Sequence, residues 1–404
     1  MADKAKVKIK GYFTDLRGWF SLPKRREAWI ETGNPKLDTS DPIAELAAKL
    51  HPGTIHASIV ATHRETPTSQ TFTLAPLKGS QLPAFHAGQY LSVKFTIDGK
   101  TLTRPFAISS APYEALENGR LDITFKVKPG GYASEYIQEN WHVGTELVLD
   151  APFGHIYYNG IRDSAHIVGI AGGSGVTIFR SLIKEMLHSG DRPDRLTLLF
   201  GSRNSSDILY RKELDELATA AGGRVTIIHV LSEPEDDWTG EKGFITAELI
   251  GRLVPDYAEA SFYVSGPAAL YDFIEPELDK LNISPMRRRI ECYGESDNIV
   301  RHPDFPGQAD KTYTLTVLLG VDRREVVALS TETIAVALER AGLAIDTRCR
   351  SGECGWCRSR LESGRIWQRP QSDGVRARDK DVGYFHPCSA YPLEDITVRV
   401  FTRL

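Results

Sequence analysis

The sequence contains few cysteines and no long apolar run. Five cysteines in 404 residues are too few for a disulfide framework, which excludes a small disulfide-stapled secreted protein. No stretch reaches the roughly 20 apolar residues of a membrane-spanning helix, and Met1 to Lys10 lacks the apolar core of a signal peptide. A dense basic stripe is also absent, which argues against nucleic-acid binding. These absences predict a cytoplasmic protein without a membrane span.

The length and composition indicate several globular domains. A chain of 404 residues is too long for one ordinary core, so two or three domains are expected. Hydrophobic residues make up 41% and charged residues 25% of the chain, as is typical of folded domains.

Four of the five cysteines follow the spacing of a metal cluster. Cys349, Cys354 and Cys357 form a C-x4-C-x2-C pattern, and Cys388 lies thirty-one residues further on. This is the ligand spacing of a plant-type [2Fe-2S] centre, whose four thiolates must converge on one small volume. A zinc site is the alternative, but zinc sites usually pair C-x2-C units and only one such unit is present. The spacing therefore predicts that these four cysteines bind a [2Fe-2S] cluster.

Residues 53–160 predict an antiparallel β-barrel, because short alternating apolar runs are separated by turn residues. Inside this segment lie Arg104-Pro105-Phe106-Ala107-Ile108-Ser109-Ser110 and the turn Gly130-Gly131-Tyr132-Ala133-Ser134. A glycine turn at a helix start favours a bound anion, because backbone N–H groups and the helix dipole point at it.

Residues 161–300 alternate strands with helices, which predicts a doubly wound parallel sheet of the α/β class. Its first strand is a continuous apolar run that ends in Gly172-Gly173-Ser174-Gly175-Val176-Thr177. Such a turn between strand and helix brings backbone donors to a phosphate, although it is not the G-x-G-x-x-G fingerprint.

Two further segments complete the chain. Residues 301–311 form a Pro/Gly-rich linker, and residues 312–404 alternate strands and a helix around the cysteine motif, which predicts a small mixed sheet. Residues 1–52 form an N-terminal extension in which Trp19, Phe20 and Trp29 surround Lys24-Arg25-Arg26. This extension either packs its aromatic side chains on the following domain or binds a partner or a membrane.

Taken together, these motifs resemble the ferredoxin–NADP reductase superfamily, in the oxygenase-reductase type that ends in a plant-type ferredoxin. The resemblance implies a multidomain protein with an antiparallel β-barrel for the flavin, an α/β doubly wound domain for the nicotinamide nucleotide, and an α+β β-grasp domain for the cluster.

In that family the arginine of an Arg-x-Tyr-Ser motif binds a flavin phosphate and the aromatic residue packs at the isoalloxazine. Here Phe106 replaces the tyrosine and Ala107 replaces the serine whose hydroxyl lies near flavin N5, so Ser109 or Ser110 is the candidate substitute, and Ser109 is the one selected. The Gly130-Gly131-Tyr132-Ala133-Ser134 turn fits a pyrophosphate, which favours FAD over FMN. The residues implied to bind the flavin are Arg104, Pro105, Phe106, Ala107, Gly130, Gly131 and Ser134.

The resemblance also implies a nicotinamide site with Ser265 and Glu291 near the reacting atoms. Ser265 replaces the cysteine of the family's C-G-P motif, and Glu291 belongs to an E-x-[FY] ending close to the flavin. Arg203 stands where the family reads a 2′-phosphate, which slightly favours NADPH over NADH. The residues implied to bind these cofactors are Gly172, Gly173, Gly175, Thr177, Arg203, Gly266, Pro267 and Tyr293.

The implied activity is an NAD(P)H-dependent reductase. Hydride passes from the nicotinamide to the flavin, and single electrons then pass through the cluster to an acceptor protein such as an oxygenase or a demethylase. The alternative is an electron-transfer subunit or redox-sensing module with little NAD(P)H turnover.

Eight arginines near the cluster motif suggest that the acceptor presents an acidic docking patch. They are Arg348, Arg350, Arg358, Arg360, Arg365, Arg369, Arg376 and Arg378. Alternatively, some of them contact the acidic middle of the chain itself.

Overall fold

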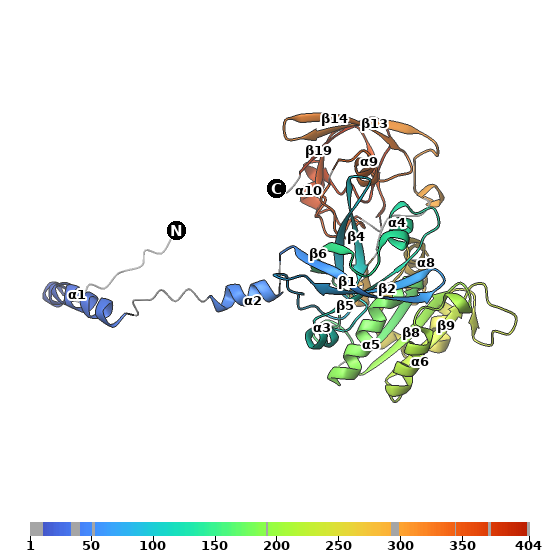
Figure 1. The fold of residues 1–404 in the computed structure, drawn as a ribbon, viewed down its shortest axis with the longest axis horizontal. Helices are drawn as coiled ribbons and strands as arrows, with labels where there is room; N and C mark the ends of the chain where they lie inside the picture. Colours follow the sequence, from blue (N-terminus) through green and yellow to red (C-terminus); the bar gives the residue numbers. More distant parts are fainter. Residues whose placement is uncertain are drawn as a thin grey trace. The chain divides into compact units, whose positions relative to one another are not determined.

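The computed structural model describes residues 11–33, 41–50, 53–190, 193–291, 299–343, 345–370 and 373–401 (Figure 1). Contacts within the chain separate two units, Met1–Leu46 and Ala47–Leu404. Among the described residues, no helix combines the length and the apolar character needed to cross a membrane.

The N-terminal extension contains two helices, α1 (Tyr12–Thr32) and α2 (Pro42–Leu50). Helix α2 begins at Pro42, and Oδ1 of Asp41 accepts hydrogen bonds from the backbone N–H groups of Ile43 and Ala44 in its first turn. In α1 the side chains of Trp19, Phe20 and Trp29 are exposed.

Six antiparallel strands form the first domain of the larger unit, called here the barrel. Their order is β4-β3-β6-β1-β2-β5, and a bridge between Ile108 and Ile123 connects the end of β4 to β5, so the two edges meet. Inward-facing side chains such as Phe72 and Leu91 fill its core. This confirms the predicted antiparallel barrel. Its elements are β1 (Ile55–Thr66), β2 (Ser69–Pro76), β3 (Tyr90–Ile97), β4 (Lys100–Ala107), α3 (Pro112–Asn118), β5 (Leu121–Lys126), α4 (Tyr132–Asn140) and β6 (Glu146–Phe153).

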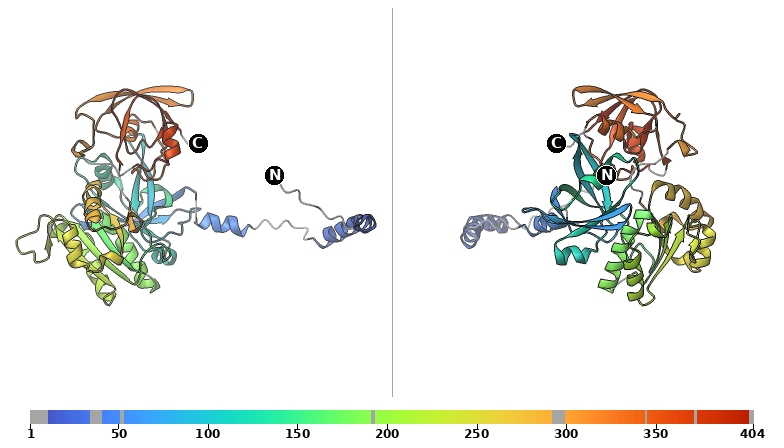
Figure 2. Two further views of the ribbon diagram at one scale, coloured as in Figure 1. Left: turned by 180° about the vertical axis from the view of Figure 1, so that it is seen from behind. Right: turned by 45° about the vertical axis from the view of Figure 1, so that its right-hand side comes forward.

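A six-stranded parallel sheet of order β10-β9-β8-β7-β11-β12 forms the parallel-sheet domain. Figure 2 shows it from two further sides, in green to yellow. The chain enters at β7 and later returns to its other side at β11, so the sheet has a switch point between these strands, where α/β folds bind ligands. Its strands are β7 (His166–Gly172), β8 (Arg195–Ser202), β9 (Val225–Leu231), β10 (Glu241–Lys242), β11 (Ser261–Ser265) and β12 (Arg288–Ile290).

Helices cover the two faces of this sheet, and each face has its own apolar core. Ile167 and Phe179 belong to one core, whereas the neighbouring Val168 and Phe262 belong to the other, as expected for strands that are buried on both faces. The helices are α5 (Thr177–Ser189), α6 (Arg211–Ala220), α7 (Ala247–Leu253) and α8 (Ala268–Lys280), and the 3₁₀ turns are η1 (Gly173–Val176), η2 (Ser205–Asp207), η3 (Tyr257–Glu259) and η4 (Pro285–Arg287).

The C-terminal domain is a mixed sheet of order β14-β13-β19-β15-β17, in which β13 and β19 are parallel. Helix α9 begins after Thr333, whose hydroxyl accepts from the backbone N–H of Val336. Ahead of the sheet, Phe305 of the linker packs on Trp367 and Tyr391. The elements are η5 (Ile299–Arg301), β13 (Thr312–Leu319), β14 (Asp322–Leu329), α9 (Ile334–Arg340), β15 (Ser359–Ser363), β16 (Ile366–Gln368), α10 (Ala377–Asp381), β17 (Tyr384–Phe385), β18 (Ala390–Pro392) and β19 (Ile396–Val400).

Candidate functional site

A cavity of about 880 Å³ is lined by residues of all three domains of the larger unit. The barrel contributes β4, β5 and the start of α4, and the parallel-sheet domain contributes η1 and the end of β11. The C-terminal domain contributes α9 and Arg350. The predicted residues on its lining are Arg104, Pro105, Phe106, Ala107, Gly131, Ser134, Gly175, Thr177, Ser265, Gly266 and Pro267.

On the barrel side, Phe106 packs against Trp141 with ring centroids 6.0 Å apart. The turn before α4 is a tight cradle: a Cβ added to Gly131 would lie 2.5 Å from Oγ of Ser134 and 2.8 Å from the carbonyl oxygen of Lys128. A helix start of this kind suits the phosphates of a flavin.

On the nucleotide side, the turn after β7 approaches the end of β11 very closely. A Cβ on Gly175 would lie 2.0 Å from the carbonyl oxygen of Ser265, so only glycine fits there. The hydroxyl of Ser265 is buried and has no hydrogen-bond partner among the described residues. Because buried hydroxyls are normally paired, this one fits a polar group of a ligand at the switch point.

Four predicted cofactor residues lie outside the lining of this cavity. Gly172 ends β7, and Gly173 and Gly130 have left-handed φ angles of 52° and 72° beside the lining residues. Arg203 is exposed just after β8. Tyr293 lies outside the described residues.

Ser109 is separated from the cavity. It is fully buried, and its hydroxyl lies 3.1 Å from that of Thr124, which also contacts the hydroxyl of Tyr210. Burial raises the pKa of Tyr210 to about 12, so its phenol stays neutral and can donate. No spacing in the sequence indicates this hydroxyl chain, because it joins the barrel to a residue of another domain.

The cysteine motif forms a loop in which the thiols converge. The sulfur atoms of Cys357 and Cys388 lie 3.4 Å apart, and Sγ of Cys349 accepts from the backbone N–H of Cys354 at 3.4 Å. The pKa of Cys349 is lowered, first because the Cys354 thiol donates a hydrogen bond to it. The same hydrogen bond raises the pKa of the Cys354 thiol, as expected when two neighbouring thiols share a proton.

Two hydroxyls in this loop also fit a cluster. Those of Thr347 and Ser351 are buried and have no hydrogen-bond partner among the described residues. Hydrogen bonds to the sulfur atoms are one of the ways in which a protein tunes such a cluster. Arg350, Gly352 and Gly355 adopt left-handed φ angles of 56°, 83° and 69°, which give the loop its tight course.

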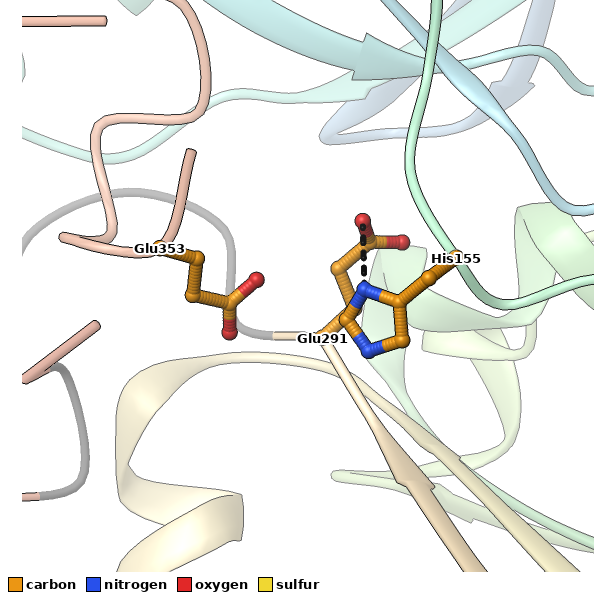
Figure 3. Close-up of side chains that lie close together, drawn as sticks. All are labelled: His155, Glu291 and Glu353. Atoms are coloured by element: carbon orange, nitrogen blue, oxygen red, sulfur yellow. Dashed lines mark ion pairs between the residues drawn. The ribbon is translucent and has the colours of Figure 1, made fainter. Parts of the chain in front are cut away.

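Three side chains from distant segments meet beside the loop: His155 after β6, Glu291 after β12, and Glu353 within the loop (Figure 3). Nδ1 of His155 lies 3.8 Å from Oε1 of Glu291, and ligand atoms of all three lie within 4.8 Å of one another. Gly154, with a φ of 101°, makes room, because a Cβ there would lie 2.8 Å from Glu291. Sequence reasoning selected Glu291 but missed His155 and Glu353, since no periodicity links them.

Five of the eight arginines near the cysteine motif form ion pairs with carboxylates of the chain. Arg369 contacts Asp272 of the parallel-sheet domain, and the others pair inside the C-terminal domain. The guanidinium group of Arg348 lies over the rings of Phe153 and Trp356. The five pairs are Arg350–Glu339, Arg358–Asp379, Arg365–Glu394, Arg369–Asp272 and Arg378–Asp381.

Three family models match consecutive parts of the chain. An oxidoreductase FAD-binding domain matches residues 57–158, an oxidoreductase NAD-binding domain matches residues 170–275, and a 2Fe-2S iron-sulfur cluster binding domain matches residues 318–393. The order of these matches is that of the three domains in the structure.

Similar proteins include reductase subunits that the match covers over most of their own length. The glycine betaine monooxygenase reductase subunit of Chromohalobacter salexigens is 25% identical over 78% of this chain and 87% of its own. The stachydrine N-demethylase reductase subunit Stc4 of Rhizobium meliloti is 26% identical over 83% of this chain and 93% of its own. Among solved structures, phthalate dioxygenase reductase matches 90% of this chain and all of its own chain, with a TM-score of 0.62 and 19% identity.

Proposed function

We propose that the chain is a member of the ferredoxin–NADP reductase superfamily, in the type with a C-terminal [2Fe-2S] domain, and that it is the reductase component of an oxygenase or demethylase system. The chain is an NAD(P)H-dependent oxidoreductase with FAD-binding, NAD-binding and 2Fe-2S domains. The observation that carries the proposal is the shared cavity, in which the Arg104–Ala107 strand, the Ser265–Pro267 turn and residues of the cluster domain meet.

We propose domain boundaries at 53–160, 161–300 and 312–404, with residues 301–311 as the linker. The three matched segments fall within these boundaries.

The residues that line the barrel side of the cavity are assigned to two parts of the flavin, its phosphates and its ring. We assign the flavin phosphates to Arg104 and to the turn before α4, and the ring to the Pro105–Ala107 segment. When bound, a flavin accepts a two-electron hydride and releases single electrons, which links a nicotinamide to a one-electron centre.

On the nucleotide side, the turn formed by Gly172, Gly173 and Gly175 approaches the phosphates, and Thr177 ties this turn by donating to the carbonyl oxygen of Ser174 at 2.9 Å. We assign the buried hydroxyl of Ser265 to the nicotinamide, next to Gly266 and Pro267. We also assign Glu291 a role near the reacting atoms, because its buried carboxylate lies 3.8 Å from Nδ1 of His155 beside the cysteine loop.

The choice of nicotinamide depends on Glu235. The backbone N–H and the hydroxyl of Ser205 both donate to its carboxylate, at 3.2 and 2.8 Å, and hydrogen bonds from the backbone and from Ser205 lower its pKa. An ionised carboxylate beside Arg203 and Ser205 repels a 2′-phosphate but accepts a bond from a ribose hydroxyl. We therefore propose NADH as the preferred donor, although Arg203 alone favours NADPH.

We propose that the electron acceptor carries an acidic docking patch. Exposed arginines such as Arg360 and Arg376 support this patch, whereas most of the other arginines form ion pairs within the chain. Long-range attraction between such surfaces weakens with salt, so turnover with the acceptor should fall as ionic strength rises. We also propose a cytoplasmic location, supported by cysteines in cluster spacing.

The test of the reductase function is an anaerobic titration of the purified protein with NADH and then NADPH, followed by absorbance and low-temperature EPR. Bleaching of the flavin bands together with the signal of a reduced [2Fe-2S] cluster is the expected result. No bleaching with either nucleotide would leave a carrier or sensor module instead.

A further inference from the structure

The C-terminal domain completes the cavity through one carboxylate shared by two guanidinium groups. Glu339 lies near the end of α9. Its Oε1 accepts from Nη1 of Arg350 at 2.5 Å, and its Oε2 lies 3.3 Å from Nη1 of Arg104 in the barrel. The side chains of Arg350, Glu339 and Arg104 are 2%, 6% and 24% exposed, so this contact between domains is largely shielded from water.

The contact of Glu339 with Arg350 is shorter than its contact with Arg104. This difference in length determines how the negative charge of Glu339 is shared between the two arginines. A charge-assisted hydrogen bond strengthens as it shortens, so Glu339 is held mainly by Arg350. Without Arg350, the same carboxylate would neutralise Arg104 and would face any anion in the cavity with a negative charge. Other basic side chains on the lining, such as Lys100 and Lys128, already make the cavity suitable for an anion.

We propose that Arg350 is a positioning residue of the flavin phosphate site: because it shares Glu339 with Arg104, the carboxylate neutralises the charge of Arg104 only in part. This inference rests on the proposed flavin site. Arg350 directly follows the cluster ligand Cys349. Binding of the flavin phosphate in the barrel would therefore depend on the fold of the cluster loop. The site of the cofactor is thus shared between two domains.

The proposal predicts a specific pattern among variants. Arg350→Gln frees the carboxylate to capture Arg104 and to repel phosphate, so FMN and FAD should bind about tenfold more weakly or worse. Riboflavin, which has no phosphate, should bind within about twofold of wild type. The double variant Arg350→Gln/Glu339→Gln removes the harmful carboxylate and should recover most of the affinity for FAD.

The experiment titrates riboflavin, FMN and FAD into flavin-depleted protein that retains its cluster, with flavin fluorescence as the readout and cluster absorbance as the check on folding. Arg360→Gln, an exposed arginine of the same domain, is the matched control and should bind all three ligands as wild type does. Glu339→Gln alone should bind FAD at least as tightly as wild type, and it gives a test even where Arg350→Gln fails to hold the cluster.

Several results would overturn the proposal. These are an equal loss of riboflavin binding in Arg350→Gln, a double variant as weak as the single one, and a weakened Glu339→Gln. A wild-type protein that binds none of the three flavins would instead refute the proposed function itself.

Discussion

Arg369 of the C-terminal domain forms an ion pair with Asp272 of helix α8 in the parallel-sheet domain. Its Nη2 also donates to the carbonyl oxygen of Ala268 at 3.3 Å, and its side chain is 4% exposed. The pair therefore joins the cluster domain directly to the nucleotide domain, next to the Ser265–Pro267 turn that precedes α8.

Replacing Arg369 should loosen this junction. Arg369→Gln leaves Asp272 without its charged partner, at a cost of roughly 1 to 3 kcal/mol, and Asp272 is partly exposed, which places the loss toward the lower end. We expect cluster reduction by NADH to slow several-fold while flavin reduction keeps its rate, as stopped-flow absorbance can show. Arg365→Gln, whose pair with Glu394 lies within its own domain, is the control. Unchanged cluster reduction in Arg369→Gln would contradict this role.

A methyl group at Gly175 should weaken the binding of NADH at the switch point of the parallel sheet. The added Cβ would collide with the backbone of Ser265 at 2.0 Å, and no rotamer change relieves a clash with backbone; overpacking of this kind costs about 1 to 3 kcal/mol. Gly175→Ala should therefore bind NADH at least about tenfold more weakly, by equilibrium titration. Gly201→Ala, whose new Cβ would have its nearest neighbour at 3.5 Å, should behave like wild type. Equal NADH affinity in the two variants would argue against this site.

Glu235 should control the choice between the two nicotinamide nucleotides. Glu235→Gln keeps the size of the side chain but removes the charge that repels a 2′-phosphate, so 2′,5′-ADP should bind about tenfold more tightly while 5′-AMP changes little. Isothermal titration calorimetry measures both affinities without any redox step. Asp237→Asn, a nearby exposed carboxylate, should leave them unchanged. If 2′,5′-ADP already binds wild type more tightly than 5′-AMP, the preference for NADH is refuted.

His166 should make the stability of the parallel-sheet domain sensitive to acid. Burial, together with repulsion from Arg195, lowers its pKa to about 4, and Nη2 of Arg195 donates to its Nδ1 at 2.9 Å. The unfolded chain binds this proton near pH 6.5, so between pH 6.5 and 4 the unfolded state holds more protons and stability falls as the pH falls. His166→Gln should show a smaller drop in melting temperature from pH 7 to pH 5 than wild type. Parallel curves would contradict the assignment.

The sequence was sufficient for features whose signal is local. The cysteine spacing predicted the converging thiols, alternating apolar runs predicted the barrel strands, and the continuous apolar run that ends at Gly172 predicted the buried strand β7. The contact of Arg104 with Glu339 could not be predicted, because it joins residues far apart in the chain that share no periodicity. For Arg369 the sequence offered only the alternative that some arginines contact the acidic middle of the chain, which the pair with Asp272 bears out without the partner having been named. Ser109 shows the same limit, since its neighbour Thr124 lies on another strand.

The positions of Cys357 and Cys388 also affect how the C-terminal domain folds. Cys357 and Cys388 enclose thirty residues, including β15 and α10. A cluster bound to both cysteines would close this segment as a covalent cross-link does and would restrict the unfolded chain. Assembly of the iron–sulfur centre would then act as a folding step for the C-terminal domain only. Iron shortage should then yield molecules whose nucleotide domain is folded but which hold their flavin more weakly and pass no electrons to the acceptor.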